Sequence, residues 1–107
     1  MLTKKEIEKI INSIKNEYEP DKIILFGSYS TDLANKHSDL DLLIIKDSEK
    51  SRIERGLEIK KLLRKYKMCF AIDLLIYTPE ELEQENFGKN SFINNVLEEG
   101  KVVYERI

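Results

Sequence analysis

The sequence predicts a single α/β (α+β) domain, and three observations support this class. Predicted helices alternate with predicted strands along the chain. The 107 residues suit one domain spanning residues 1–107, with no internal repeat or low-complexity linker to divide it. The composition is 41% hydrophobic and 36% charged, which supplies apolar material for one core and excludes a wholly disordered chain.

Capping and apolar signals define the elements of the first half. A Thr-x-x-Glu capping box at Thr3–Glu6 opens a run of isoleucines at helical spacing. Pro20–Asp21 ends that run, and the apolar residues that follow are typical of a buried strand. The elements expected are a helix from the capping box to about Glu17, a strand over 23–26, a turn at 27–28, a short helix over 29–34, a polar loop over 35–38 and a strand over 39–45.

The second half is predicted in the same way. A long, charged, proline-free segment carries a broad apolar stripe, which indicates a helix. Thr78-Pro79-Glu80-Glu81 forms a second capping box with proline at the first helical position, and Gly100 is a helix-ending glycine. The elements expected are a helix over 48–67 with its stripe at Ile53, Leu57, Ile59, Leu62, Leu63 and Tyr66, a strand over 69–77, a short acidic helix from 79, a helix over 91–99 and an edge strand over 102–104.

The connection between the first two strands predicts their orientation. Only about 12 residues separate the end of the first strand from Asp39, which is short for a parallel crossover. If the two strands pair, we therefore expect them to be antiparallel. That arrangement places Gly27–Ser28 beside Asp39 and Asp41.

Three aspartates interrupt the predicted strands. Asp39 and Asp41 lie two residues apart and so point to the same face, while Asp73 lies in an otherwise apolar strand. An unpaired carboxylate inside a sheet costs several kcal/mol unless a cation or a proton compensates it. Taken singly, Asp39 can be a strand-end acid facing water and Asp73 a salt-bridge partner of a lysine. Taken together with Gly27–Ser28, the three acids favour a site for Mg²⁺.

Composition also bears on partners and location. Eighteen Lys and Arg against 20 Asp and Glu give a net charge of −2, which argues against direct nucleic-acid binding by bulk charge. Cys69 is the single cysteine, so no intramolecular disulfide and no cysteine-based zinc site can form. With no signal peptide and no long apolar segment, we expect a cytoplasmic protein without a membrane partner.

The spacing of these residues resembles a known pattern. Gly27-Ser28, ten residues, then Asp39-Leu40-Asp41 match the Gly-Ser-x10-Asp-x-Asp signature of the nucleotidyltransferase superfamily. The chain is most similar to the minimal nucleotidyltransferases, the MNT or MntA-like proteins of prokaryotes. Ile72-Asp73-Leu74 looks like the third carboxylate strand of that family. The resemblance extends from roughly Ile7 to the C-terminus.

The resemblance implies a fold and a set of site residues. The fold is a DNA polymerase β-like nucleotidyltransferase core, with a mixed sheet flanked by helices. Asp39, Asp41 and Asp73 would be catalytic and would hold two Mg²⁺ ions, and Asp73 would also take the proton from the attacking hydroxyl. Gly27 and Ser28 would bind the triphosphate of the substrate, ATP.

The resemblance also implies an activity and a partner. The reaction would move a nucleoside monophosphate, AMP from ATP, onto a hydroxyl, and the acceptor would be a tyrosine of a HEPN-type toxin that this chain opposes as an antitoxin. One departure is visible, since many members carry Arg-Gly after Gly-Ser where this chain has Thr31–Asp32. Two alternatives follow from it: a non-catalytic antitoxin that neutralises its partner by contact, and a sensor that binds the nucleotide without transfer. Base preference and a homo-oligomeric state are left open.

Overall fold

The computed structural model describes residues 2–65, 72–86 and 92–107, and the side chains of 85 and 86 are not described. Its elements, in chain order, are α1 (Lys4–Tyr18), β1 (Lys22–Phe26), the 3₁₀ helix η1 (Gly27–Ser30), β2 (Leu40–Ile45), α2 (Arg52–Leu63), β3 (Ile72–Tyr77), α3 (Pro79–Asn86), α4 (Phe92–Glu99) and β4 (Lys101–Glu105). The alternation of helices and strands confirms the predicted α/β class.

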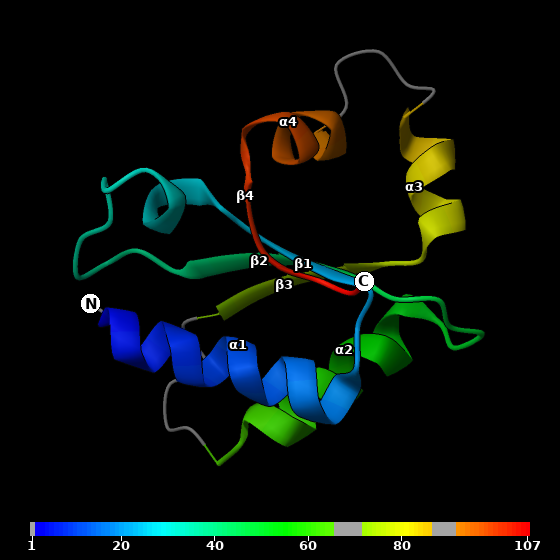
Figure 1. Cartoon of the computed structure of the whole chain (residues 1–107), viewed down its shortest axis with the longest axis horizontal. Coiled ribbons are helices and arrows are strands. Elements are labelled where there is room, and N and C mark those ends of the chain that lie inside the picture. Colours follow the sequence, from blue (N-terminus) through cyan, green and yellow to red (C-terminus); the bar gives the residue numbers. More distant parts are fainter. Residues whose placement is uncertain (1, 66–71, 87–91) are drawn as a thin grey trace.

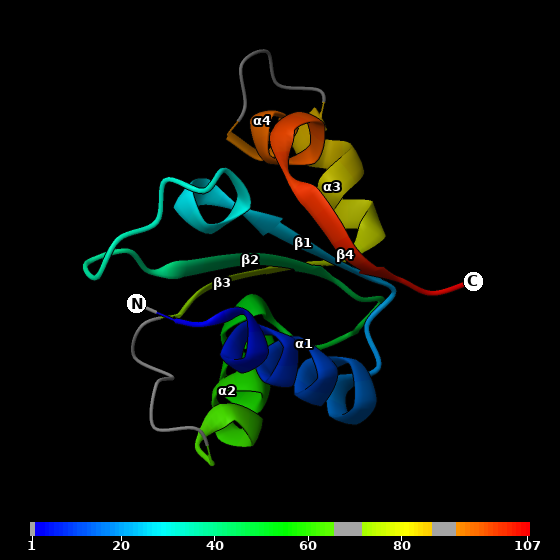
Figure 2. The same cartoon turned by 60° about the vertical axis from the view of Figure 1, so that its left-hand side comes forward.

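The strands form one mixed sheet in the order β3-β2-β1-β4. β1 pairs antiparallel with both β2 and β4, and β2 pairs parallel with β3. The expected antiparallel pairing of the first two strands is therefore confirmed. Helices α1 and α2 cover one face of the sheet, and α3 and α4 cover the other (Figures 1 and 2).

Alternation along the strands separates two apolar clusters. Leu40, Leu42 and Ile44 of β2 pack with α1 and α2, whereas Leu43 and Ile45 pack with α3 and α4. Strand β2 thus contributes apolar side chains to both layers, as expected of a central strand. Any polar residue at an odd-numbered position of β2 faces the α3–α4 layer.

The predicted short helix over 29–34 is wrong. The helical turn instead begins two residues earlier, as η1, and residues 31–39 form turns and loop. The hydroxyl of Ser30 donates to the Gly27 carbonyl at 2.7 Å, and the Thr31 hydroxyl donates to the Ser28 carbonyl at 3.3 Å. These side chains take backbone acceptors that a longer helix would use, and Asp32 has a φ of 60°, outside the helical range.

The long helix expected over 48–67 is shorter in the structure. It begins after Ser51, whose side chain and that of Glu54 form a capping box that the prediction missed, and it ends at Leu63. The apolar stripe is also divided: Ile59 and Leu63 are buried, but Ile53 and Leu57 are 77% and 59% exposed. The remaining residues expected in this helix, 66 and 67, lie outside the described residues, as do 69–71 of the expected third strand.

The last helices and the final strand agree with their signals. Thr78 and Glu81 form the predicted capping box of α3, and α4 ends before Gly100. Gly100 is needed because neighbouring atoms pack closely against its Cα, and not because its backbone is left-handed. A Cβ there would lie 2.4 Å from both the Ile24 side chain and the Val96 carbonyl. Strand β4 is an edge strand beside β1, as expected. No helix in the described ranges is long and apolar enough to cross a membrane.

Candidate active site

Strand pairing brings the predicted site residues to one place in the sheet. Phe26 at the end of β1 lies opposite Asp41 of β2, and Asp41 lies opposite Asp73 of β3. Gly27 follows Phe26 directly and therefore lies next to Asp41. The expected juxtaposition of the Gly-Ser turn with the aspartates is present.

The aspartates lie on the face of the sheet covered by α3 and α4. Their even-numbered neighbours, including Leu40 and Leu42, pack on the other face, so Asp41 and Asp73 face the α3–α4 layer. Asp41 is half-buried, whereas Asp39 and Asp73 are exposed. Asp39 immediately precedes β2, one residue outside the strand that was expected to begin with it.

Gly27 is required here for two reasons. Its φ of 73° lies in the left-handed region that disfavours other residues. In addition, a Cβ at this position would lie 2.2 Å from the Oδ2 atom of Asp41. The carboxylate of Asp41 thus occupies the space that any other side chain would need, and the glycine sets the position of the acid.

The three carboxyl groups interact electrostatically. The pKa of Asp41 is raised to about 6, chiefly by burial, and also by the charge of Asp73, a hydrogen bond between the Asp41 and Asp73 carboxyl groups and the charge of Asp39. Perturbation of this kind is common at functional sites.

The donor set fits a hard divalent cation. Within the described ranges, no set of three or more His, Cys, Asp or Glu side chains is arranged so that it could already hold one metal ion. Mg²⁺, however, is commonly held by one or two carboxylates together with substrate phosphates and water. The hydrogen-bonded pair of Asp41 and Asp73, with Asp39 close by, provides such oxygen ligands.

Ser28 of η1 is half-buried and lines a hollow of about 430 Å³ between η1 and α4. Gly27 lines the same hollow, so the turn expected to bind phosphate forms one wall of a cavity. The other wall includes Phe92 and Asn95 of α4. The sequence prediction missed these α4 residues, because they lie more than 60 positions after Ser28 and carry no motif.

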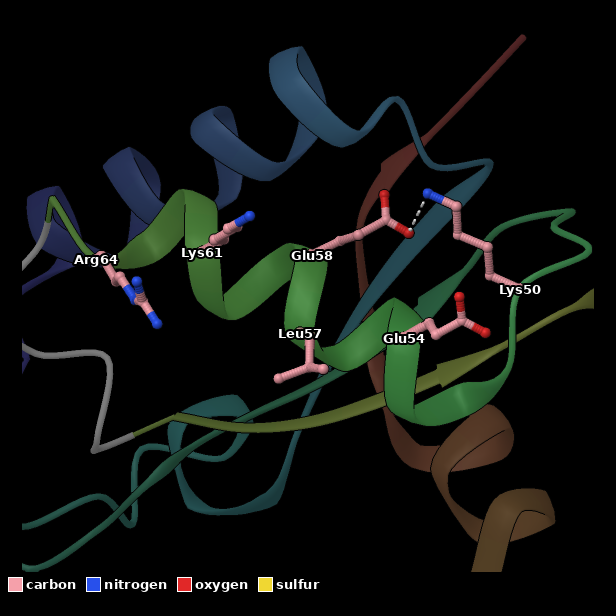
Figure 3. Close-up of a pocket in the computed structure, with 6 residues that line it drawn as sticks. All are labelled: Lys50, Glu54, Leu57, Glu58, Lys61 and Arg64. Atoms are coloured by element: carbon pink, nitrogen blue, oxygen red, sulfur yellow. Dashed lines mark ion pairs between the residues drawn. The ribbon is translucent and has the colours of Figure 1, made fainter.

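A second hollow lies over the outer side of α2 and is shown in Figure 3. Lys50 pairs there with Glu58 at 3.1 Å, and Lys61 and Arg64 extend from the same helix. Since α2 covers the face of the sheet opposite to Asp41, this hollow is separate from the carboxylates. Acidic and basic side chains both line this hollow, which is typical of a solvated helix face.

Replacing Gly27 tests whether the turn and Asp41 depend on one another. We expect Gly27→Ala to lower the free energy of unfolding by about 2 kcal/mol or more, from left-handed strain and the displaced carboxylate. The variant should also reduce the activity that the family resemblance implies, nucleotidyl transfer, by at least about 100-fold. Urea denaturation and a transfer assay measure the two effects. Gly56→Ala is the matched control: nothing lies within 4 Å of a Cβ at Gly56, within α2, so this variant should gain about 0.5–1 kcal/mol. Equal stability changes in the two variants would contradict the expectation.

Comparisons with known proteins agree with this geometry. Residues 8–107 match the sequence profile of the family described as polymerase beta, nucleotidyltransferase. A Methanocaldococcus jannaschii protein, provisionally assigned as a protein adenylyltransferase, is 36% identical over 107 residues, covering 97% of this chain and 100% of the relative.

Two solved structures have a similar fold. A toxin–antitoxin with AMP-PNP matches with a TM-score of 0.61 and 23% identity, covering 92% of this chain and 73% of that one. A mutant of the toxin–antitoxin MntA–HpeT matches with a TM-score of 0.55 and 20% identity, covering 98% and 75%. The family profile and the 36% identical relative show that the domain is a nucleotidyltransferase. The chain belongs to the polymerase beta nucleotidyltransferase family.

Proposed function

We propose that this nucleotidyltransferase transfers AMP from ATP to a hydroxyl group of a partner protein, in a reaction that depends on Mg²⁺. The observation that carries the proposal is the group of Asp39, Asp41 and Asp73 beside the glycine turn, with the pKa of Asp41 raised to about 6. The relative assigned as a protein adenylyltransferase supports both AMP and a protein acceptor.

Each site residue has a role in this reaction. Asp39, Asp41 and Asp73 hold Mg²⁺, and two ions suit the three carboxylates. Bound Mg²⁺ neutralises phosphate charge and polarises the phosphoryl group under attack. Gly27 and Ser28 bind the triphosphate through the backbone of the exposed Gly27 and the Ser28 hydroxyl.

In this proposal Asp73 receives the proton of the acceptor. It lies on β3, an edge strand, and its side chain is exposed. The acceptor oxygen forms a bond to the α-phosphorus of ATP, and the bond from that phosphorus to the bridging oxygen of the β-phosphate breaks. Pyrophosphate leaves with the bonding electron pair, and the hydroxyl proton passes to the Asp73 carboxylate.

The acceptor that we propose is a tyrosine of a HEPN-type toxin, with this chain as the antitoxin. The support is that both structural neighbours described above are toxin–antitoxin proteins. A non-catalytic antitoxin is the second candidate, because Thr31–Asp32 stands where many family members carry Arg-Gly and so offers no cation to phosphate.

Label transfer separates the two candidates. The chain is incubated with Mg²⁺, ATP labelled on the α-phosphate and the protein of the adjacent gene, and the same assay is run with Asp39→Ala/Asp41→Ala and with ATP labelled on the γ-phosphate. We expect label on the partner only when the wild type is combined with ATP labelled on the α-phosphate. No label should appear when a chelator is present during the reaction. A wild type that transfers nothing, combined with a double variant that still neutralises the partner, would establish the contact mechanism instead.

A further inference from the structure

Two large apolar side chains are exposed at one hollow of this molecule. Leu33, in the loop after η1, is 74% exposed, and Phe92, at the start of α4, is 60% exposed. Both line the hollow between η1 and α4, although 59 positions separate them. Exposed apolar groups that gather from distant parts of a chain around one cavity indicate a ligand site.

This hollow and the catalytic group meet at Gly27. Gly27 and Ser28 belong to its wall, and the space beside Gly27 is occupied by the carboxylate of Asp41. Phe26, which also lines the hollow, lies opposite Asp41 in the sheet. A ligand whose phosphates lie on η1 can therefore extend its remaining part into the hollow.

The structure assigns this hollow to the nucleobase and ribose of the nucleoside triphosphate, an inference that rests on the proposed function. The volume of about 430 Å³ falls within the range of small-molecule pockets. The apolar side chains of the lining suit a partly apolar occupant, and Gly27 and Ser28 in the same wall suit one that carries phosphates. A nucleoside triphosphate has this form.

The aromatic wall explains how a base would be held. The rings of Phe26 and Phe92 meet edge to face, with centroids 5.8 Å apart and an interplanar angle of 75°. This contact orients the Phe92 ring while most of the residue stays accessible. An oriented, accessible ring stacks on a nucleobase without a large loss of side-chain entropy.

The same helix face provides polar groups. Asn95 and Glu99 follow Phe92 by three and seven residues, so all three lie on one side of α4, and all three line the hollow. The Asn95 amide can both donate and accept hydrogen bonds at a base edge. The Glu99 carboxylate can accept hydrogen bonds from ribose hydroxyls or from base N–H groups. We infer that these two residues discriminate among nucleotides.

The test compares two ligands that share the triphosphate. Calorimetric titration measures the Kd of Mg-ATP and of Mg-tripolyphosphate for wild type, Phe92→Ala and Phe92→Tyr. Phe92→Ala is expected to weaken ATP binding roughly 5- to 100-fold, from the loss of stacking, and to leave tripolyphosphate within about twofold. Phe92→Tyr keeps the ring and should bind ATP nearly as wild type does. Asn95→Ala should change the ratio of ATP to GTP affinity.

The controls distinguish this inference from the function on which it rests. Ile53→Ala removes an apolar side chain of α2 that is also exposed, at 77%, and should change neither affinity. Equal effects of Phe92→Ala on both ligands, or none on ATP, would overturn the base pocket alone. If Phe92→Ala left ATP binding unchanged but lost partner binding, the base pocket would also be overturned, and the hollow would be assigned to a segment of the partner. A wild type that binds neither ligand contradicts the proposed function itself.

Discussion

Asp41→Asn is expected to abolish nucleotidyl transfer and, at the same time, to stabilise the metal-free protein. The transfer rate should fall at least about 1000-fold, because the variant loses a charged metal ligand worth several kcal/mol in the transition state. The free energy of unfolding should rise by roughly 1–2 kcal/mol at neutral pH after allowance for solvent screening, since a carboxylate with a pKa raised from 3.8 to about 6 no longer has to ionise among other acids.

The pH dependence of stability follows from the sign of this shift. The folded protein binds the Asp41 proton more tightly than the unfolded chain does, because the pKa of about 6 exceeds the ordinary value of 3.8. The stabilising contribution of Asp41 is therefore complete below about pH 4 and is lost as the pH rises through 6. Metal-free wild type should lose stability over this interval, and Asp41→Asn should remove that loss.

Urea denaturation with a chelator, at several pH values from 4.5 to 7.5, measures this effect. Asp47→Asn is the matched control, as Asp47 is an exposed aspartate beyond the far end of β2. Added Mg²⁺ should stabilise wild type and leave Asp41→Asn almost unchanged, because only the folded wild type binds the ion. A variant less stable than wild type at pH 7.5 would refute the electrostatic description of the site.

Glu81→Gln is expected to have the largest effect on stability, about 3 kcal/mol or more. Arg55 is only 3% exposed and donates to both oxygens of Glu81, at 2.7 and 2.9 Å. Arg55 also donates to the Ile76 carbonyl of β3 at 2.8 Å, so the pair joins α2 and α3 at the edge of the sheet. The variant leaves the buried guanidinium without a counter-charge, which is the costly way to break such a pair.

This pair predicts a different pH window. The hydrogen bonds from Arg55 hold the pKa of Glu81 at about 2, below the ordinary value of 4.5. Its contribution is thus complete above about pH 4.5 and is lost as the pH falls through 2. Denaturation from pH 7 to pH 2 should show this acid loss in wild type and not in Glu81→Gln. Glu80→Gln, one position away and exposed, should behave as wild type, and a similar loss in both variants would contradict the assignment.

Local signals predicted much of this fold. Capping boxes at Thr3 and Thr78 define helix starts through side-chain hydrogen bonds within four residues, so they can be read from the sequence. The short connection to Asp39 predicted the antiparallel pairing that places Gly27 beside Asp41. The family resemblance implied that Asp73 joins the other two acids, but the parallel pairing of Asp41 with Asp73 was not predicted, because strand order is decided by non-local packing.

Features that depend on distant contacts were not predictable. Arg55 is buried on α2, although the predicted buried stripe of this helix contained no charged residue. Its burial depends on the carboxylate of Glu81, which lies 26 residues later in the sequence. Ile53 and Leu57 fit the stripe but are exposed, since no described element covers that side of α2. The hollow lined by Leu33 and Phe92 likewise exists only after α4 has packed on β1.

The position of β3 at the edge of the sheet determines how two substrates can reach the site together. The hollow between η1 and α4 lies on the β1 side of β2, whereas Asp73 lies on the β3 side, with its side chain exposed. In the proposed reaction, ATP and the acceptor hydroxyl therefore arrive from opposite directions across β2. A folded protein can then present its hydroxyl at the sheet edge without inserting a flexible segment, which makes native protein surfaces accessible as acceptors.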